Sequence, residues 1–158
     1  MEFIVDGMLG KLARWLRMLG YDTKYSSRMS DDEILKAASE EGRVILTRDY
    51  EFFKRANIHG VKAVFVEGET NAEKLADLSK QININLEINI NESRCPKCNA
   101  KIASIRKENV KDKVPESTYR FYNEFWECSS CGQIYWKGSH WKKINNTLRR
   151  AKQIYFTH

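Results

Sequence analysis

The chain has 158 residues, of which 27 are Lys or Arg and 21 are Asp or Glu, so its formal net charge is +6. This length suits one domain, or one domain with a small appendage, and excludes a large multidomain assembly within the chain. The charge is unevenly divided, with a net of −2 over residues 1–90 and of +8 over residues 91–158. The basic half indicates either a polyanionic partner or a solubilising surface.

The N-terminus carries Glu2 and Asp6 and lacks the sustained apolar run of a signal peptide. No apolar stretch approaches the length that spans a bilayer. We therefore expect a cytoplasmic protein whose four cysteines stay reduced, because disulfides are rare in that compartment.

The first half of the chain alternates strand-like and helix-like segments, which is typical of an α/β fold with a parallel sheet. The expected strands lie near residues 2–5, 22–25, 43–47 and 62–66, and the expected helices near 8–19, 31–41, 50–57 and 71–82. In the first helix, one face is apolar and the opposite face is basic. The apolar face consists of Leu9, Leu12, Leu16 and Leu19, and the basic face of Lys11, Arg14 and Arg17. The basic face is either simply solvated or a phosphate-binding surface that leads toward Asp6.

Acidic residues stand where the expected strands give way to helices. Asp6 ends the first apolar run, Asp49 follows the run over residues 43–47, and Ser30-Asp31-Asp32-Glu33 opens the helix between them. In open α/β sheets, sites form beyond the carboxyl ends of the strands. Separated acids brought together there would suit Mg²⁺ or Mn²⁺, which prefer oxygen ligands and can activate water at a phosphodiester.

Helix capping is the alternative role for these acids. Ser30 and Glu33 have the spacing of a capping box. Asp6 and Asp49 each stand where an N-cap residue would. Capping could use Ser, Thr or Asn equally well, so acids at three successive junctions favour the metal interpretation over capping alone.

The acidic triplet leaves the choice of ligand open, because Asp32 or Glu33 could replace Asp31 as the inward-facing acid. No fourth acid stands out, which leaves the number of metal ions open as well. The candidates for it are Glu51, Glu67 and Glu69. Thr47 is placed to support the neighbouring acid, and Arg48 is either a plain surface residue or a phosphate contact.

Residues 81–93 alternate Asn and Ile, which predicts either a short edge strand or an extended linker. We place the division of the chain inside this segment. The expected units are residues 1–88, an α/β domain, and residues 92–158, a small cysteine-containing domain with a basic C-terminal extension.

The four cysteines form two C-x₂-C pairs, Cys95 with Cys98 and Cys128 with Cys131. Two such pairs are the pattern of a four-thiolate zinc site. A site closed by four sulfurs is structural, and zinc would supply most of the stability of so small a unit. His140 is an alternative ligand that four thiolates make unnecessary.

Ten of the 18 aromatic residues lie in residues 91–158, interleaved with Lys and Arg. Most are expected to form the core of this unit, and some to stack on bases as in single-strand binders. The candidates for nucleic-acid contact here are Tyr135, Trp136, Lys137, His140, Trp141, Lys142 and Lys143. The run Arg149-Arg150-Ala151-Lys152 predicts a helix end that could follow a phosphate backbone.

Several of these segments together resemble a known family. Residues 5–22, VDGMLGKLARWLRMLGYD, resemble the opening signature of the Mut-seven C-terminal RNase family, a PIN-like nuclease family with a C-terminal zinc ribbon. Residues 31–35 and 46–49 resemble its next two motifs. Residues 95–98 and 128–141 resemble its ribbon, so the resemblance covers nearly the whole chain.

The resemblance implies a three-layer PIN-like domain with a short parallel sheet, followed by a zinc ribbon. It implies a ribonuclease in which Asp6, Asp31 and Asp49 hold catalytic Mg²⁺ or Mn²⁺ and RNA is the partner. The chain departs from the wider PIN pattern in its short α/β part and its missing fourth acid. The alternative function is a non-catalytic RNA- or ribosome-associated binding module. A DNA-binding regulator built on the ribbon is weaker, because it gives the acids no role.

Overall fold

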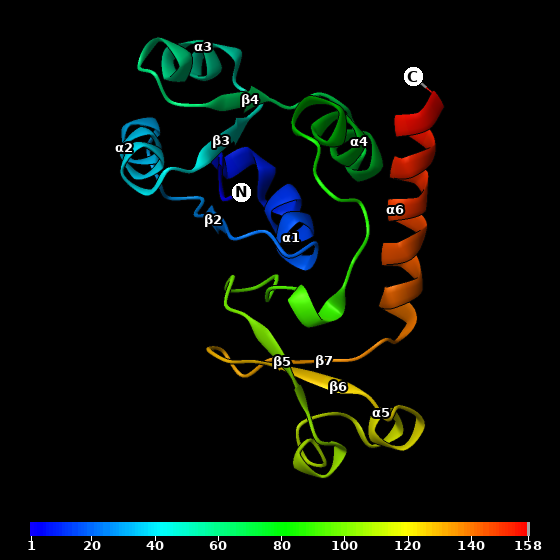
Figure 1. The fold of residues 1–158 in the computed structure, drawn as a ribbon. Helices are drawn as coiled ribbons and strands as arrows, with labels where there is room; N and C mark the ends of the chain where they lie inside the picture. The colour runs from blue at the N-terminus through cyan, green and yellow to red at the C-terminus, as the bar shows by residue number, and fades with distance from the viewer. Residues whose placement is uncertain (158) are drawn as a thin grey trace.

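The computed structural model describes residues 1–157, which contain a four-stranded and a three-stranded sheet (Figure 1). The strands of the first sheet are β1 (Phe3–Val5), β2 (Thr23–Tyr25), β3 (Val44–Thr47) and β4 (Ala63–Phe65). The helices around it are η1 (Gly7–Leu9), α1 (Gly10–Met18), α2 (Asp31–Glu41), α3 (Tyr50–Ile58) and α4 (Asn71–Ile82). All three strand pairs are parallel, in the order β2-β1-β3-β4. This confirms the α/β fold with a short parallel sheet.

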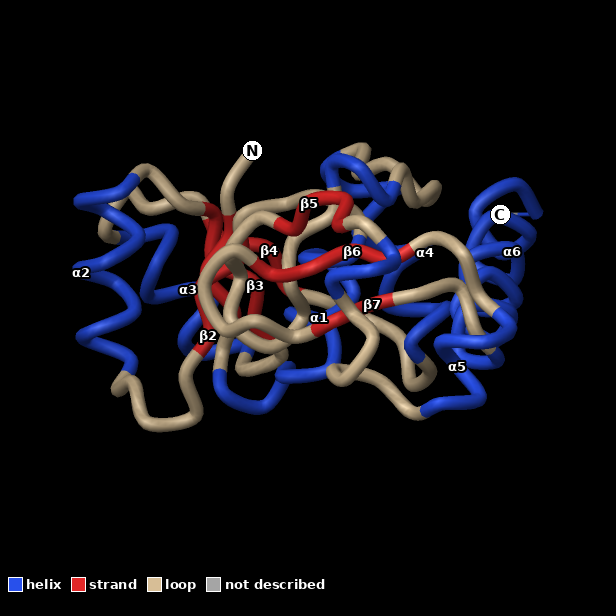
Figure 2. The backbone as a smooth tube through the Cα atoms, turned by 90° about the horizontal axis from the view of Figure 1, so that it is seen from below, coloured by secondary structure: helices blue, strands red, loops and turns tan. Residues whose placement is uncertain are grey.

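Helices cover both faces of this sheet, because successive side chains of a strand point to opposite faces. Phe3, Val5 and Leu46 pack into the core formed with α1 and α4. Ile4 and Ile45 pack into a second core with α2 and α3. Figure 2 shows α2 and α3 on one side of the strands and α4 on the other. These three layers are consistent with the PIN-like core that the resemblance implied.

The predicted elements of residues 1–82 agree with the structure to within a few residues at each end. All four leucines of the first helix are buried, as its periodicity predicts. Gly20 ends this helix with a φ of 98°. A side chain at this position would also approach the carbonyl oxygen of Glu92 at 3.2 Å, so the glycine admits both the turn and the returning chain.

The segment after α4 is a linker and contains no strand. Ile84 and Leu86 are buried against the core of the first sheet, and Asn83, Asn85 and Asn89 are exposed. The alternation of Asn and Ile therefore reflects one buried side of an extended chain. The linker leads into η2 (Ile90–Glu92), a single 3-10 turn.

The second sheet forms what we call the cysteine module, residues 93–138. It contains β5 (Ile102–Ile105), η3 (Lys107–Asn109), α5 (Glu116–Phe121), β6 (Phe125–Cys128) and β7 (Ile134–Tyr135). The sheet is antiparallel in the order β5-β6-β7. Trp126 and the two cysteines Cys95 and Cys128 are buried on one side of it, and Phe125 with Val110 on the other.

The last helix, α6 (Ser139–Thr157), leaves the cysteine module and runs beside α4 (Figure 1). Its buried residues Leu148 and Ala151 belong to the core of the first sheet. The predicted boundary, which assigned residues 92–158 to a single C-terminal unit, therefore needs revision. The cysteine module is inserted between the α/β domain and a helix that completes that domain. Residue 158 of the predicted unit lies outside the described residues.

None of the helices within residues 1–157 is both long enough and apolar enough to cross a membrane.

Candidate functional site

Asp6 and Asp49 meet at the point where the strand order of the sheet reverses. The chain passes from β1 outward to β2 and then returns to β3 on the other side of β1. In the register of this pair, Val5 lies opposite Leu46, and the N–H of Asp6 donates to the carbonyl oxygen of Leu46 at 2.9 Å. The carboxyl ends of two strands flanking such a switch point form the usual ligand crevice of an open α/β sheet.

Thr47 joins the two acids. Its side chain is fully buried, and its hydroxyl donates to Oδ2 of Asp6 at 2.7 Å. The hydroxyl oxygen of Thr47 also accepts the backbone N–H of Asp49 at 3.0 Å. The sequence predicted that Thr47 supports a neighbouring acid, and this hydroxyl fixes the position of one acid directly and of the other through its backbone.

Both acids also cap helices, as the alternative interpretation expected. Asp6 Oδ1 accepts the N–H of Met8 at 3.3 Å at the start of η1, and Asp49 Oδ1 accepts the N–H of Phe52 at 3.1 Å at the start of α3. An ionised carboxylate oxygen accepts more than one hydrogen bond or ligand. Capping therefore leaves both carboxylates able to bind a cation.

The acidic triplet at the start of α2 divides into three different environments. Glu33 forms the capping box with Ser30, whose hydroxyl accepts the Glu33 N–H at 3.2 Å. Asp32 is paired with Arg55 of α3. Asp31 takes part in neither arrangement, and it is the member of the triplet that interacts with the two acids of the sheet edge.

The pKa of Asp31 is raised above its ordinary value. Asp31 is exposed as a whole, and partial desolvation of its carboxylate is the first cause, followed by the negative charges of Asp6 and Asp49, which Arg55 partly offsets. The three residues therefore form a group of mutually repelling carboxylates at one edge of the sheet. Their oxygens are not as close as a formed metal site would hold them, because within residues 1–157 the one group of three or more ligand atoms within 4.8 Å of each other consists of cysteines.

Two of the three candidates for a fourth acid form ion pairs elsewhere. Glu51 pairs with Lys54 on the same helix at 3.1 Å. Glu69 pairs with Arg48 at 3.5 Å, and Arg48 also donates to the carbonyl oxygen of Gly68. Glu67 is exposed, and its backbone N–H donates to Asp77. Arg48 is thus bound to the loop before α4.

The four cysteines converge as the two C-x₂-C pairs predicted. Their sulfur atoms all lie within 4.8 Å of one another, with 3.7 Å between Cys95 and Cys131 and 3.3 Å between Cys98 and Cys128. All four are free thiols. Burial raises the pKa of Cys128, but the N–H groups of Cys131 and Ser130 donate to its sulfur and lower that pKa to about 6. This cluster could hold a metal ion. His140 is not part of it.

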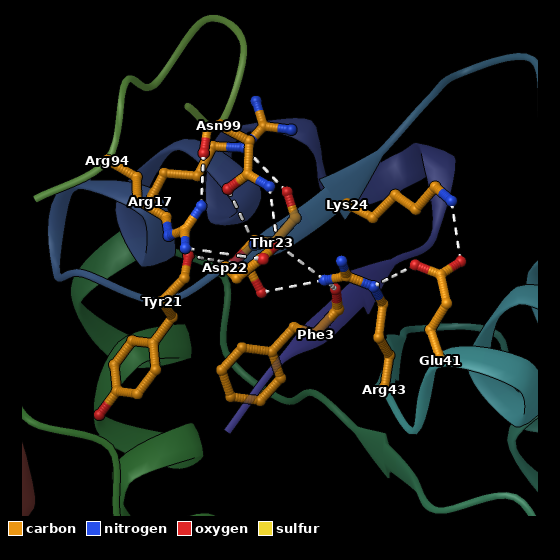
Figure 3. Close-up of polar contacts among 10 residues, drawn as sticks. All are labelled: Phe3, Arg17, Tyr21, Asp22, Thr23, Lys24, Glu41, Arg43, Arg94 and Asn99. Carbon is orange, nitrogen blue, oxygen red and sulfur yellow. Dashed lines mark hydrogen bonds and ion pairs between the residues drawn. The ribbon is translucent and has the colours of Figure 1, made fainter. Parts of the chain in front are cut away.

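A polar network connects the cysteine module to the amino edge of the sheet, opposite the acids (Figure 3). Asn99 follows Cys98 directly and adopts a φ of 73°. Its side chain accepts the N–H of Thr23 at 2.9 Å and donates to Asp22 at 2.8 Å. Arg94 lies 3.7 Å from the other oxygen of Asp22.

Arg17 and Arg43 complete this network, which we call the amino-edge clamp: Arg17, Asp22, Arg43, Arg94 and Asn99. Arg17 donates to the carbonyl oxygens of Thr23 and Pro96, each at 2.9 Å. Arg43 donates to Asp22 Oδ1 at 2.9 Å and to Glu41 Oε1 at 3.0 Å. The sequence predicted that Arg17 lies on a face that is either solvated or phosphate-binding. Both predictions are wrong for this residue, because Arg17 is only 7% exposed and its guanidinium bonds within the protein.

Asp22 has a pKa below its ordinary value. Burial alone would raise this pKa, but the hydrogen bonds from Asn99 and Arg43 and the charges of Arg43 and Arg94 outweigh that effect. Sequence analysis missed the clamp because its members are scattered through the chain. One feature of the sequence could have suggested the clamp: Asn99 directly follows the first C-x₂-C pair, and Asn tolerates a left-handed turn.

The other predicted RNA contacts fall into two groups. Lys11 and Arg14 are exposed on α1. The second group surrounds the start of α6, where Lys137, His140, Lys142 and Lys143 are exposed and Tyr135, Trp136 and Trp141 are half-buried. The amine of Lys137 lies 5.2 Å from the ring centre of Trp141 and 5.7 Å from that of Trp126.

The comparisons with known proteins give one match. The family model described as Mut7-C RNAse domain matches residues 1–148, which include the sheet edge, the cysteine module and half of α6. Searches of curated proteins and of solved structures returned no match.

Proposed function

The chain belongs to the Mut7-C RNAse domain family, and from that premise we propose that it is a ribonuclease that cleaves phosphodiester bonds with Mg²⁺ or Mn²⁺ held by Asp6, Asp31 and Asp49. The observation that supports this proposal is that three acids lie along the carboxyl edge of the sheet, near its switch point. They come from three separate strand-to-helix junctions. Asp31 in particular is not needed to cap its helix, because Ser30 does so.

The donor set suits a hard cation, which takes carboxylate oxygens and keeps several water molecules. Such an ion supplies activation of water and stabilisation of the leaving oxygen. Asp6, Asp31 and Asp49 would hold such an ion. The buried hydroxyl of Thr47 orients the Asp6 carboxylate, and the start of α3 holds the Asp49 carboxylate. Burial and the charges of Asp6 and Asp49 raise the pKa of Asp31, and a bound cation would relieve that repulsion.

We also propose that the cysteine cluster holds one structural Zn²⁺. In a tetrahedral site with zinc–sulfur bonds near 2.3 Å, neighbouring sulfurs lie about 3.8 Å apart. The distances of 3.7 Å and 3.3 Å are near that value. Four thiolates leave no open position for a substrate. Because free thiolates persist in a reducing compartment, we place the protein in the cytoplasm.

RNA is the partner that this proposal requires, and the net charge of +8 over residues 91–158 supports it. The cysteine module is docked at the amino edge of the sheet through Arg17, Asp22 and Asn99. The acids lie at the carboxyl edge. RNA that contacts both must therefore extend past the α/β domain from one edge of the sheet to the other.

Cleavage of a labelled single-stranded RNA in the presence and absence of Mn²⁺ tests the enzyme proposal, with Asp6→Asn as the diagnostic variant. Asn retains the size and the capping oxygen of Asp6 and removes the charge that binds the cation. We expect the rate to fall at least about a hundredfold, since each 1.4 kcal/mol of lost stabilisation costs a factor of ten, and the thermal midpoint to stay nearly constant.

The control is Asp77→Asn, an acid of α4 that bonds to Gln81 and the backbone of Glu67. It should cleave at the parental rate. Equal rates for the parent, Asp6→Asn and Asp49→Asn would show that the acids have no catalytic role.

The second candidate function is a non-catalytic RNA- or ribosome-associated binding module. One observation favours this function: the carboxylate oxygens of the acids, unlike the cysteine sulfurs, do not lie within 4.8 Å of one another as the ligands of a metal site would. In this case the parent protein binds RNA and cuts it with neither metal.

A further inference from the structure

A cavity of about 630 Å³ lies where the cysteine module meets the start of α6 and the end of α1. Figure 1 shows α6 leaving the module at this point. The walls include four aromatic side chains. These are Tyr122, Tyr135, Trp136 and Trp141. A cavity of this size with an aromatic lining and a few polar groups is typical of a site for a small flat ligand.

The polar groups of this cavity carry no negative charge. Arg94, Gln133 and His140 line it, and no Asp or Glu does. The first turn of α6 contains no acid, and the exposed amines of Lys142 and Lys143 follow it. The N–H groups of a helix start and adjacent lysines favour a phosphate.

The other large cavity, of about 810 Å³ between α4 and α6, differs in this respect. Its lining includes three acids, Glu67, Glu73 and Asp77, and two bases, Lys80 and Arg150. The acids outnumber the bases and oppose a polyanion, so charge distinguishes the two cavities. The aromatic one is suited to a nucleotide and the acidic one is not.

The aromatic walls are held in place by the surrounding structure. The ring centres of Trp136 and Phe125 lie 6.3 Å apart. Any side chain at Gly138 would bring its Cβ to 2.9 Å from the indole nitrogen of Trp136, so the indole lies directly on the glycine. Lys137, which does not line the cavity, places its amine over the ring of Trp141. Preformed rings lose little conformational freedom when a base stacks on them.

We propose that this cavity binds one unpaired base of single-stranded RNA, with the neighbouring phosphates at the start of α6. The proposal rests on the proposed function, because it assigns the substrate of that enzyme to the single-stranded class. A base in a duplex is covered by its pairing partner and its stacking neighbours, and it would have to leave the helix to enter. An apolar peptide segment is the other occupant that the aromatic lining would admit.

The cavity lies at a distance from the acids, so the base that it binds is separate from the phosphodiester bond that is cleaved. Met18 at the end of α1 lines the cavity, and Asp6 precedes η1 at the other end of this pair of helices. The nine residues of α1 and the three of η1 together measure on the order of 20 Å. The anchored base is therefore several nucleotides away from the bond that is cut.

The test is the affinity of single-stranded oligoadenylate, about 12 nucleotides long, for the full chain carrying Asp6→Asn, which prevents cleavage during the measurement. In this background, Trp141→Ala should weaken binding roughly tenfold, the loss expected for one stacked base. Trp141→Phe should retain most of the affinity. Phe156→Ala, which removes an 80% exposed aromatic ring from the far end of the same helix, should have no effect.

The same comparison on a duplex of equal length separates stacking from charge. We expect the parent and Trp141→Ala to bind the duplex equally. Quenching of tryptophan fluorescence by the single strand, reduced in Trp136→Phe, gives a second readout that does not depend on the stability of the alanine variant. Equal affinity of parent and Trp141→Ala for the single strand would overturn the proposal and leave the peptide as the occupant. Because binding is measured without cleavage, failure of the nuclease proposal would not produce this result.

Discussion

The two edges of the parallel sheet carry charge in opposite ways. At the carboxyl edge, burial and the charges of Asp6 and Asp49 raise the pKa of Asp31, and the nearby Arg55 only partly offsets them. At the amino edge, Asp22 is surrounded by Arg43, Arg94 and Asn99, and its pKa is lowered. One fold thus contains an acidic group in which repulsion exceeds compensation and another in which compensation prevails.

This difference indicates which charges act in structure and which in function. Compensated charges at the amino edge connect the α/β domain to the cysteine module and leave nothing for a ligand to neutralise. Uncompensated carboxylates cost folding free energy unless a cation binds them, and such groups gather at functional sites. The same amino acid, aspartate, therefore has different expected effects when it is changed at the two edges.

The largest expected effect is on the cysteine module, which the amino-edge clamp connects to the α/β domain. Cys128→Ser should abolish metal binding and unfold the cysteine module, because structural zinc contributes on the order of 10 kcal/mol to folding in small zinc domains. Hydrogen exchange should show lost protection in β5, β6 and β7 and retained protection in β1 and β3. Elemental analysis of the parent should give one zinc per chain. A zinc-free parent, purified without chelators, would contradict the assignment.

The next effect concerns the acidic triplet. Asp31→Asn should lower the cleavage rate at least about a hundredfold, because it removes a ligand and each 1.4 kcal/mol costs a factor of ten. Asp32→Asn changes the neighbouring acid, which pairs with Arg55, and should change the rate less than about threefold, as expected for an exposed ion pair. If the two variants lose equal activity, the assignment of Asp31 over Asp32 is wrong.

A smaller effect is expected at the amino edge, where Asp22→Asn should lower the free energy of unfolding without changing the cleavage rate of the folded protein. Loss of the charged hydrogen bonds to Arg43 and Asn99 should cost about 2 kcal/mol of unfolding free energy. Cleavage per folded molecule should stay constant. A variant with parental stability would contradict the role of the clamp.

The effect of Asp22 also depends on pH. Since the folded pKa of Asp22 is lowered, its stabilisation is complete above the ordinary value of about 4 and is lost as pH falls through the folded value. The difference in unfolding free energy between the parent and Asp22→Asn should therefore be constant near neutral pH and shrink below about pH 4.

The smallest effect is on RNA affinity. Changing Lys142 and Lys143 to Glu should weaken binding about tenfold at low salt and less at high salt, because released counterions drive the contact. Lys11→Glu and Arg14→Glu on the α/β domain provide a matched pair of exposed basic residues. Thermal stability should change little in either pair. An affinity that does not depend on salt would contradict the electrostatic contribution.

The carboxyl edge could be predicted from the sequence because its information is local. Asp6 directly follows a short apolar strand, Asp49 stands shortly after another, and Asp31 opens the helix between them. The helix after Asp6 shows a clear period in its leucines. The two C-x₂-C pairs are local in the same sense. Within the triplet the residues alone leave the choice open and the family resemblance favours Asp31, and the structure adds that Asp32 and Glu33 interact with other residues.

The amino edge could not be predicted because its contacts join distant parts of the chain. Asn99 bonds to Asp22 across 77 positions, and Arg17 bonds to Pro96 across 79. Arg17 has the helical position of a solvated residue, and its burial results from the docking of the cysteine module over it. The return of α6 to α4 escaped prediction for the same reason, since the basic sequence of the helix concealed the buried positions Leu148 and Ala151.

The most direct test of the central claim is anomalous diffraction from crystals of the parent protein soaked in Mn²⁺ at neutral pH. The account predicts manganese between the carboxylates of Asp6, Asp31 and Asp49, with shortened distances among these groups, and none at Asp22. Crystals in which the three acids remain without metal at millimolar Mn²⁺, or in which manganese binds at the amino edge instead, would contradict it.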